Sequence, residues 1–406
     1  MRFFITSIAL LFYHFGFSYG WVQLSDFGGE ARHRTPMLTI GNKIYTGQGH
    51  YNGAGTNILF GDWWEYDPSS NTWSQKADYG GGPVYHASGF VIDNFGYVGT
   101  GRITASGNNL TQDFFRYDSQ TNTWQQIADF PGLPRRGAVG FAIGEFGYVG
   151  TGEPQSGGTM YNDFYRYNPS NNTWMQIATM PTSGRVSGVG FELDGYGYVG
   201  TGGFSSWGNS QNDFWRYDPN TNTWQQMANV GPTPRMEATG FSLNGKGYIL
   251  CGDNFSSGTN YDDMYEYDPG TNTWIQILDF KGSARRYMAA TTVNGLAYLG
   301  LGTNGTNFKD FWMFDQTLAT TNLDLEKITI FPNPYSEFVK VDLSAFNDGL
   351  EHVSLQFINY KGKEVLRILG EDLKNPINTA LLPSGNYLIT ILYKGQLLET
   401  KKTVKY

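Results

Sequence analysis

Arginine and aspartate recur at nearly fixed intervals along this chain. In five places an arginine stands thirteen residues before a tyrosine: Arg32, Arg135, Arg185, Arg235 and Arg285. Six aspartates follow with the same period: Asp62, Asp113, Asp163, Asp213, Asp263 and Asp310. Guanidinium groups bind carboxylate and sulfate bidentately, so the arginines could form a funnel for an acidic ligand. They could instead pair with the aspartates and tie neighbouring repeats together. Repetition favours the pairing, because a tie is needed in every repeat whereas a ligand needs one asymmetric place.

A second pattern places oxygen-bearing side chains at alternate positions, as the start of a calcium loop does. In YDPNTNTW, which begins at Tyr217, these residues are Asp218, Asn220 and Asn222. An EF-hand loop continues with glycine and reaches a glutamate at its twelfth position, where this chain has threonine and asparagine. The stretch recurs with Ser, Gln or Gly in place of the second ligand. The sequence therefore predicts a tight turn between two strands, and it predicts no metal site.

The turn belongs to a repeat of about fifty residues. Its tryptophans are spaced 51, 50, 50 and 50 residues apart: Trp73, Trp124, Trp174, Trp224 and Trp274. Four short strands are predicted in each unit, in the third unit over residues 138–142, 146–150, 163–167 and 173–178. Four strands per period of this length are typical of the blades of a β-propeller.

The repeat resembles the kelch family, which builds propellers from units with glycines after the second strand and a tyrosine separated by six residues from a tryptophan. Tyr117 and Trp124 show this spacing, which recurs in five units, whereas the glycine doublet is replaced by Gly-Thr-Gly at Gly150–Gly152. Six modules begin near Arg32, Val84, Arg135, Arg185, Arg235 and Arg285. The last module lacks its tryptophan strand, and WVQLSDF, Trp21–Phe27, is predicted to supply it. The expected fold is all-β: a six-bladed kelch-type propeller over residues 21–317, closed by an N-terminal strand.

A different module follows a predicted linker at residues 318–327. From residue 328 to 406, apolar and polar residues alternate between turn residues, which predicts a small antiparallel β-sandwich. The segment resembles the C-terminal sorting domain of type IX secretion cargo in FPNP at Phe331–Pro334, LPSGNY at Leu382–Tyr387 and KKTVKY from Lys401. The resemblance implies a Bacteroidota outer membrane, contact with the type IX machinery, and removal of this domain on release or surface attachment. An immunoglobulin-like binding domain is the alternative.

The N-terminus and the composition indicate an exported protein. Residues 1–20 combine Arg2 with an apolar run and small residues near Gly20, as a signal peptide does, with an uncleaved anchor as the alternative. We expect a secreted or surface location, reached through the periplasm, and no transmembrane segment in the mature chain. The net charge of −8 argues against nucleic acid as a partner. A single cysteine, Cys251, excludes an internal disulfide and a CxxC zinc site.

The loops after the second strands differ most between repeats, and loops on a rigid scaffold often carry recognition. They are rich in Gly, Ser and Asn and hold single aromatic residues, among them Tyr51, Trp207 and Phe255. Polar amides beside a stacking ring suit sugar recognition. We therefore predict ligand contacts at these aromatic residues and at the arginines, with an extracellular glycan or a protein as partner.

Catalytic motifs are scarce, which favours a binding protein over an enzyme. The chain has no nucleophile elbow, phosphate loop or dinucleotide fingerprint, and no cofactor is predicted. The kelch resemblance brings two enzyme classes into view. Copper oxidases of this type need a crosslinked Cys and Tyr with two His, which the surroundings of Cys251 do not match. Some six-bladed kelch proteins are sugar-acid mutarotases or epimerases that use an arginine and an acid, for which Glu153, Glu237 and the arginines could serve.

Overall fold

The computed structural model of this protein describes residues 20–53, 55–105, 107, 109–155, 158–205, 208–316, 328–343, 350, 353–393 and 396–406. They form two compact units, one of which is Trp21–Asp315, while the other lies in Gln316–Tyr406. Apart from Gly20, the predicted signal peptide lies outside the described residues, and so does the predicted linker. No helix among the described residues is long and apolar enough to cross a membrane.

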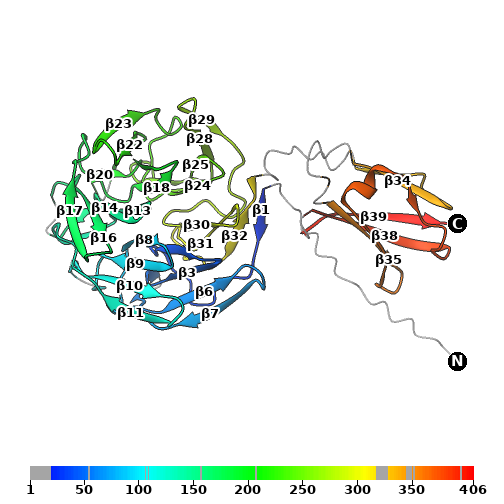
Figure 1. Ribbon diagram of the computed structural model, residues 1–406, viewed down its shortest axis with the longest axis horizontal. Helices are drawn as coiled ribbons and strands as arrows, with labels where there is room; N and C mark the ends of the chain where they lie inside the picture. The colour runs from blue at the N-terminus through cyan, green and yellow to red at the C-terminus, as the bar shows by residue number, and fades with distance from the viewer. Residues whose placement is uncertain are drawn as a thin grey trace. The chain divides into compact units, whose positions relative to one another are not determined.

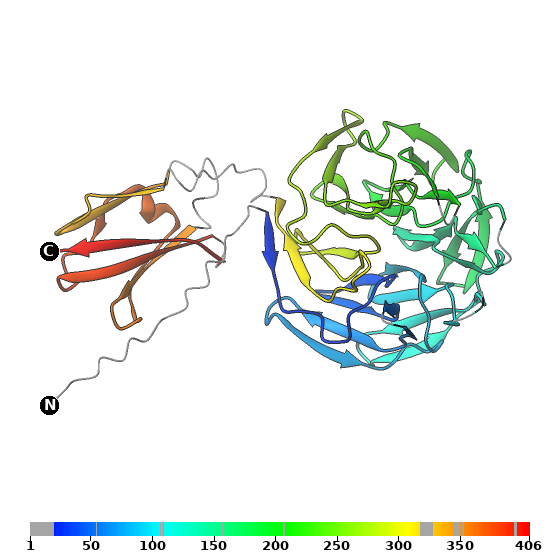
Figure 2. The same ribbon diagram turned by 180° about the vertical axis from the view of Figure 1, so that it is seen from behind.

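The first unit is a ring of six four-stranded antiparallel sheets, here called blades 1 to 6 (Figures 1 and 2). From the innermost strand outward, blade 1 is β2 (Met37–Ile40), β3 (Lys43–Gly47), β6 (Trp63–Asp67) and β7 (Thr72–Lys76); blade 2 is β8 (Ser88–Ile92), β9 (Phe95–Gly99), β10 (Phe114–Asp118) and β11 (Thr123–Gln126); blade 3 is β13 (Val139–Ile143), β14 (Phe146–Gly150), β16 (Phe164–Asn168) and β17 (Thr173–Ile177). Blade 4 is β18 (Val189–Leu193), β19 (Tyr196–Gly200), β22 (Phe214–Asp218) and β23 (Thr223–Met227); blade 5 is β24 (Thr239–Leu243), β25 (Lys246–Leu250), β28 (Met264–Asp268) and β29 (Thr273–Gln276); blade 6 is β30 (Ala289–Val293), β31 (Leu296–Gly300), β32 (Phe311–Phe314) and β1 (Trp21–Gln23).

In four blades, residues that follow the second strand take part in a further two-stranded ladder. They are β4 (His50–Gly53) with β5 (Thr56–Leu59), β12 (Arg135–Arg136) with β15 (Glu153–Pro154), β20 (Gly203–Ser205) with β21 (Gly208–Ser210), and β26 (Asp253–Asn254) with β27 (Thr259–Asn260).

Blade 6 is completed by the N-terminal strand, as the sequence predicts. In the β1–β32 pair, Trp21 lies opposite Phe314 and Gln23 opposite Trp312. The Trp21 ring also contacts Phe280 edge-on, with 5.1 Å between the ring centroids. Because both ends of the propeller chain meet in one sheet, the ring is closed and leaves no open edge between its ends.

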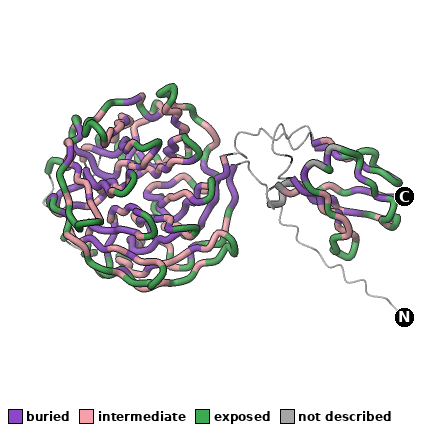
Figure 3. Tube along the Cα trace, in the orientation of Figure 1, coloured by how far each residue is buried: buried purple, intermediate pink, exposed green. Residues whose placement is uncertain are grey.

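Neighbouring blades pack through a repeated contact between a phenylalanine and a glycine. A Cβ added to Gly147 of blade 3 would stand 2.1 Å from the ring of Phe90 in blade 2, and one added to Gly197 of blade 4 would stand 2.4 Å from Phe141 in blade 3. The first glycine of the Gly-Tyr-Val-Gly segment is therefore required by the close approach of a ring from the preceding blade. The inner strands that pack in this way form the buried part of the propeller (Figure 3).

The YDPNTNTW turn joins each blade to the one before it. Asn222 has a left-handed φ of 52°, and its side-chain oxygen accepts from the Tyr217 hydroxyl and from the backbone N–H of Ala178 in the preceding blade, both at 2.9 Å. The Trp224 indole donates to the carbonyl of Ala178 at 2.8 Å. The same three bonds recur at the turns of Asn71, Asn122, Asn172 and Asn272. The repeated turn is thus a clamp between blades.

The second unit holds two sheets over one core. One sheet contains β33 (Thr329–Phe331), β34 (Phe338–Asp342) and β37 (Ile377–Asn378); the other contains β36 (Glu364–Leu369), β35 (Val353–Asn359), β38 (Gly385–Tyr393) and β39 (Gln396–Lys405), and η3 (Gly370–Lys374) is a short 3₁₀ helix. Val339 and Val341 of the first sheet share a buried cluster with Leu355, Phe357 and Ile389 of the second. This packing is that of a small β-sandwich.

Candidate ligand-binding site

The repeated arginines are buried and paired with the repeated aspartates. In blade 4, the guanidinium of Arg185 lies 2.8 and 2.7 Å from the two carboxylate oxygens of Asp213 and donates to the carbonyl of Thr201 at 2.8 Å. The same arrangement holds for Arg32, Arg135, Arg235 and Arg285, each at most 1% exposed. Each pair lies within one blade, so the expected tie between repeats is wrong in this respect. The use of these arginines as ligand contacts stays a prediction.

The residue two positions further along lines the propeller axis. Its backbone is left-handed in every blade, with φ between 54° and 62°. The backbone N–H of His86 donates to the carbonyl of Arg34 at 3.0 Å. The same backbone bond recurs from each later blade to the one before it, up to the bond from Tyr287 to Glu237. We call these six residues the inner ring: Arg34, His86, Gly137, Ser187, Glu237 and Tyr287. A left-handed conformation costs a residue other than glycine about 1–2 kcal/mol, so the ring is held by its surroundings.

A second tier of side chains surrounds the inner ring. In each blade, the residue after the arginine, or after Val84 in blade 2, pairs with a residue that follows the second strand. We call these six pairs the outer tier: His33–His50, Tyr85–Arg102, Arg136–Glu153, Val186–Gly203, Met236–Asp253 and Arg286–Thr303. Every blade therefore offers the same backbone with different side chains.

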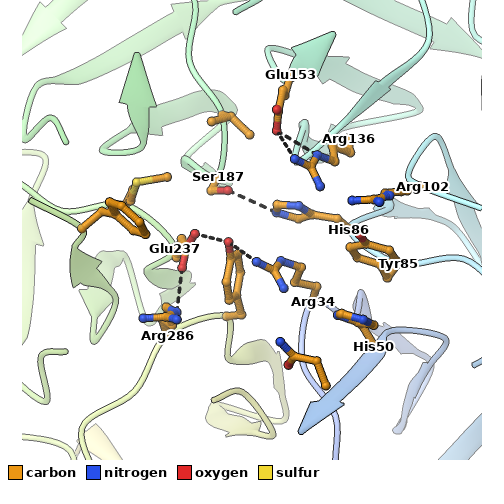
Figure 4. A pocket seen from close by; sticks show the side chains of 15 residues that line it. Arg34, His50, Tyr85, His86, Arg102, Arg136, Glu153, Ser187, Glu237 and Arg286 are labelled. Carbon is orange, nitrogen blue, oxygen red and sulfur yellow. Dashed lines mark hydrogen bonds and ion pairs between the residues drawn. The ribbon is translucent and has the colours of Figure 1, made fainter. Parts of the chain in front are cut away.

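The inner ring and the outer tier enclose a cavity of about 230 Å³ on the propeller axis (Figure 4). Asn52 and Phe255, from loops after the second strands, also line it. A second cavity, of about 120 Å³, adjoins the inner ring and is lined by small residues such as Ala87 and Gly188. The cavity is smaller than the ~300–1,000 Å³ of sites for drug-sized molecules, so it suits a small ligand.

Arginine dominates the charge of this cavity. Four guanidinium groups face two carboxyl groups in its lining: Arg34, Arg102, Arg136 and Arg286 against Glu153 and Glu237. Arg136 lies 2.7 Å from Glu153, and Arg286 lies 3.1 Å from Glu237. Among the described residues, Arg34 and Arg102 have no carboxylate partner. A protein of net charge −8 thus keeps a positive cavity, which favours an anionic ligand.

Arg34 and Arg102 lie beside one aromatic ring. Their guanidinium carbons are 5.9 and 5.6 Å from the centroid of Tyr85. Arg34 donates to the Tyr287 hydroxyl at 2.6 Å and to His33 Nδ1 at 3.0 Å, and Arg102 donates to the carbonyl of Gly107. An arginine has five N–H donors, and the Nε–H of both residues is buried without a partner, so each keeps at least two Nη–H donors for a ligand. Figure 4 shows both side chains near Tyr85, with Glu237 on the side of the cavity opposite Arg102.

Glu237 can exchange a proton near neutral pH. Burial raises its pKa to about 7, against the opposing charge of Arg34. The Tyr287 hydroxyl donates to Oε1 of Glu237, while Arg286 lies at Oε2. Burial also raises the pKa of Asp253, beside Arg286, to about 6. A carboxyl group that titrates near the working pH suits proton transfer.

Three histidines gather at the same place, although they are far apart in the sequence. His50 stacks on Tyr85 with 4.6 Å between the ring centroids, and the ring centroid of His33 lies 5.0 Å from that of His50. His86 Nε2 lies 3.2 Å from Ser187 Oγ. Burial lowers the pKa of each, and the charge of Arg34 adds to the effect, so the rings are neutral at pH 7. In the described part of the chain, no three His, Cys, Asp or Glu side chains are grouped to hold a metal.

The other residues predicted from the sequence have different positions. Phe255 lines the cavity and is 39% exposed. Tyr51 lies on β4 between the cavity residues His50 and Asn52, and alternation along a strand turns it to the other face. Trp207 lies outside the described residues, and its role stays a prediction. Glu153 and Glu237, named for the enzyme alternative, both line the cavity.

The sequence reasoning missed the inner ring as a site. Two residues after each arginine position the repeats read Arg, His, Gly, Ser, Glu and Tyr. A position that changes its chemistry in every repeat, within a motif that otherwise holds, was the available signal. The arginine two positions earlier is the more regular feature and draws attention away from this variation.

Comparison with known proteins agrees with this architecture. Residues 142–322 match the family described as the KLHDC2/KLHL20/DRC7 Kelch-repeats domain, and residues 329–406 match the secretion system C-terminal sorting domain. The solved structure of YjhT superposes with a TM-score of 0.61 at 15% identity, over 72% of this chain and 97% of YjhT. At this identity the likeness concerns the fold alone. In all, 793 solved chains match, and a shared fold does not determine a function. No curated protein matches the sequence. The chain thus joins a kelch-type β-propeller to a C-terminal sorting domain of the type IX secretion system.

Proposed function

We propose that the propeller binds a small acidic carbohydrate in its axial cavity. One observation carries the proposal: Arg34 and Arg102 line a recessed cavity beside Tyr85, with free donors and without a carboxylate partner among the described residues. Two guanidinium groups in this arrangement suit a carboxylate or a sulfate, which accepts paired hydrogen bonds. The buried pairs, such as Arg185–Asp213, stabilise the fold. Arg34 and Arg102 do not take part in such pairs and are therefore available to a ligand.

The rest of the cavity suits a sugar. Asn52, Ser187 and Tyr287 offer hydrogen-bonding groups for hydroxyls, and the exposed ring of Phe255 offers a stacking surface. A protein partner, the other class that the sequence suggested, buries about 800 Å² on each side. A recess of about 230 Å³ takes a small molecule more readily than such a surface.

The sorting domain supports a role outside the cell for this function. A C-terminal domain of this family directs its chain through type IX secretion to the cell surface or the medium. We further propose that residues 1–20 are the signal peptide for passage through the periplasm, and that the host belongs to the Bacteroidota. Supporting observations are the apolar run after Arg2 and the small residues near Gly20.

The test is isothermal titration of the full chain with hexuronic acids, sulfated sugars and their neutral counterparts. We expect binding of an acidic sugar that weakens at least about tenfold in Arg34→Gln and in Arg102→Gln. Arg116→Gln is the matched control, because Arg116 of β10 stacks on Phe95 and does not line the cavity. Equal affinity for acidic and neutral sugars, or an equal loss in the control, would contradict the proposal.

A second function, interconversion of the anomers of a sugar acid, is favoured by the position of Glu237. Its carboxylate form could take the proton of the anomeric hydroxyl. The ring oxygen of the sugar would take a proton from the hydroxyl of Tyr287, which contacts Glu237. The bond between the anomeric carbon and the ring oxygen then breaks to give the open-chain carbonyl form. Closure on the other face of that carbonyl returns both protons, so the reaction needs no cofactor.

Nuclear magnetic resonance of a freshly dissolved sugar acid measures this activity as the rate of approach to anomeric equilibrium. We expect the chain to raise the rate, and Glu237→Gln to lose most of the increase while still binding the sugar. A rate equal to that of the buffer alone would refute the catalytic function and leave the binding function standing.

A further inference from the structure

One side of the cavity carries no charge in its outer tier. Five of the six described pairs include a charged or ring-bearing polar side chain, whereas blade 4 supplies Val186 and Gly203. A Cβ on Gly203 would lie 3.1 Å from Met236 Sδ, so this glycine lets the methionine of blade 5 approach. Val186, Met236 and Phe255 of blades 4 and 5 therefore form an apolar wall in the cavity lining, next to the polar Ser187 and Glu237 of the same blades.

The apolar wall has a buried part and an exposed part. Val186 and Met236 line the cavity and belong to one buried cluster with Met160. Phe255, from the loop of blade 5, lines the same cavity and remains 39% exposed. Phe255 is therefore the part of the apolar wall that presents accessible surface to a ligand in the cavity.

The apolar wall lies across the axis from the anion site. In a ring of six blades, blade 4 is opposite blade 1 and blade 5 is opposite blade 2. Arg34 comes from blade 1 and Arg102 from blade 2, whereas Val186 comes from blade 4 and Phe255 from blade 5. The cavity thus has two arginines without a carboxylate partner among the described residues on one side, and three apolar side chains beside Glu237 on the other.

We propose that the ligand is two-ended: an acidic sugar that carries an apolar substituent, such as an alkyl or aryl group, on the side away from its acidic group. The acid lies at Arg34 and Arg102, and the substituent lies against Phe255, Val186 and Met236. This inference rests on the proposed binding of an acidic sugar and adds to it a second subsite. Burial of the substituent supplies affinity that an unsubstituted sugar acid lacks.

Titration of the full chain with three probes separates the two ends: D-glucuronate, phenyl β-D-glucuronide and phenyl β-D-glucoside. We expect phenyl glucuronide to bind about tenfold more tightly than glucuronate, which corresponds to about 1.4 kcal/mol, and phenyl glucoside to bind weakest of the three. Phe255→Ala and Val186→Thr should bring the ratio between the two glucuronides close to one. Glucuronate alone should bind Val186→Thr within about twofold of the parent, and in Phe255→Ala it should lose less affinity than phenyl glucuronide does.

The control is Ile275→Ala, which removes an exposed apolar side chain of β29 outside the cavity. It should leave the ratio unchanged, and a loss as large as that in Phe255→Ala would overturn the subsite. Equal affinity of the parent for glucuronate and phenyl glucuronide would overturn the two-ended ligand while the binding of acidic sugars stands. If neither glucuronide binds at millimolar concentration, this inference falls, and the titration with the other hexuronic acids and the sulfated sugars decides the binding proposal.

Discussion

The arginines of the blades and the residues of the inner ring lie two positions apart in the sequence and behave in opposite ways. Arg185 and its equivalents are the same residue on the same partners, buried within five of the six blades, and Val84 takes this place in blade 2. The inner ring keeps its left-handed backbone around the axis and changes its side chain in every blade. A feature that every blade needs is repeated, whereas a site for one ligand must differ from blade to blade. In a repeat protein, the variable position inside a constant motif is therefore the better guide to function.

The repeated elements should dominate stability, and closure should have the largest effect. Deleting Trp21–Phe27 removes β1, leaves the edge of β32 unpaired and opens the ring. We expect the deletion variant to lose cooperative thermal unfolding. Calorimetry measures this against the full chain, with a chain that begins at Gly20 as control. A truncated protein that melts within a few degrees of the control would show that closure by β1 is dispensable.

A single repeated arginine should matter next. Arg235→Ala leaves the Asp263 carboxylate without its bidentate partner in a largely buried position, and the loss of one partner of such a pair costs about 3 kcal/mol. Urea unfolding measures the change, and Arg116→Ala, a half-buried arginine with a glutamine partner, should cost less than about 1 kcal/mol. If Arg235→Ala abolished ligand binding with unchanged stability, the comparison between the two sets of residues would be reversed.

The clamp between blades should contribute less to the free energy of unfolding. Its contribution has two parts, the hydrogen bonds of Asn222 and the left-handed backbone of that residue. Asn222→Ala removes two hydrogen bonds and leaves alanine at φ 52°, for a loss of about 2–3 kcal/mol in unfolding free energy. Asn222→Gly removes the same bonds but tolerates the left-handed backbone, so about 1–2 kcal/mol should be lost. Chemical denaturation of both variants gives the difference. Equal losses would mean that the backbone conformation contributes nothing.

The smallest effect concerns pH. Burial raises the pKa of Glu237 to about 7, so protonation between pH 8 and pH 6 removes a negative charge from a cavity that binds an anion. Affinity for an acidic sugar should therefore increase several-fold as pH falls through 7, and more gently near 6, where Asp253 titrates. Glu237→Gln should flatten the profile above pH 6.5. Affinity that falls with falling pH in the parent would contradict this role.

Most of the fold could be predicted because the same pattern of strands and turns recurs in several units of the sequence. The tryptophan period gave the blades, and the incomplete last module pointed to Trp21–Phe27 as the closing strand. The clamp was recognised as a turn, but its bonds to the preceding blade depend on packing between blades, which a local pattern does not contain. The Arg–Asp pairs were expected, and only their placement within one blade had to come from the structure.

The site was predicted only in part. Phe255, Glu153 and Glu237 were named from the sequence and line the cavity, whereas Arg34, Arg102 and the histidines were not. His50 and His86 are brought together by the closure of the ring, which no spacing in the sequence reveals. The left-handed turn that directs Arg34 to the axis is equally invisible in a list of residue types.

The most direct test is a crystal structure of the protein soaked in selenate, an analogue of sulfate whose anomalous scattering locates it. The account predicts selenate in the axial cavity, on the guanidinium groups of Arg34 and Arg102, and its loss in Arg34→Gln crystals. Selenate on Arg235 and its equivalents, with an empty cavity, would contradict the claim that the variable inner ring, and not the repeated arginines, forms the binding site.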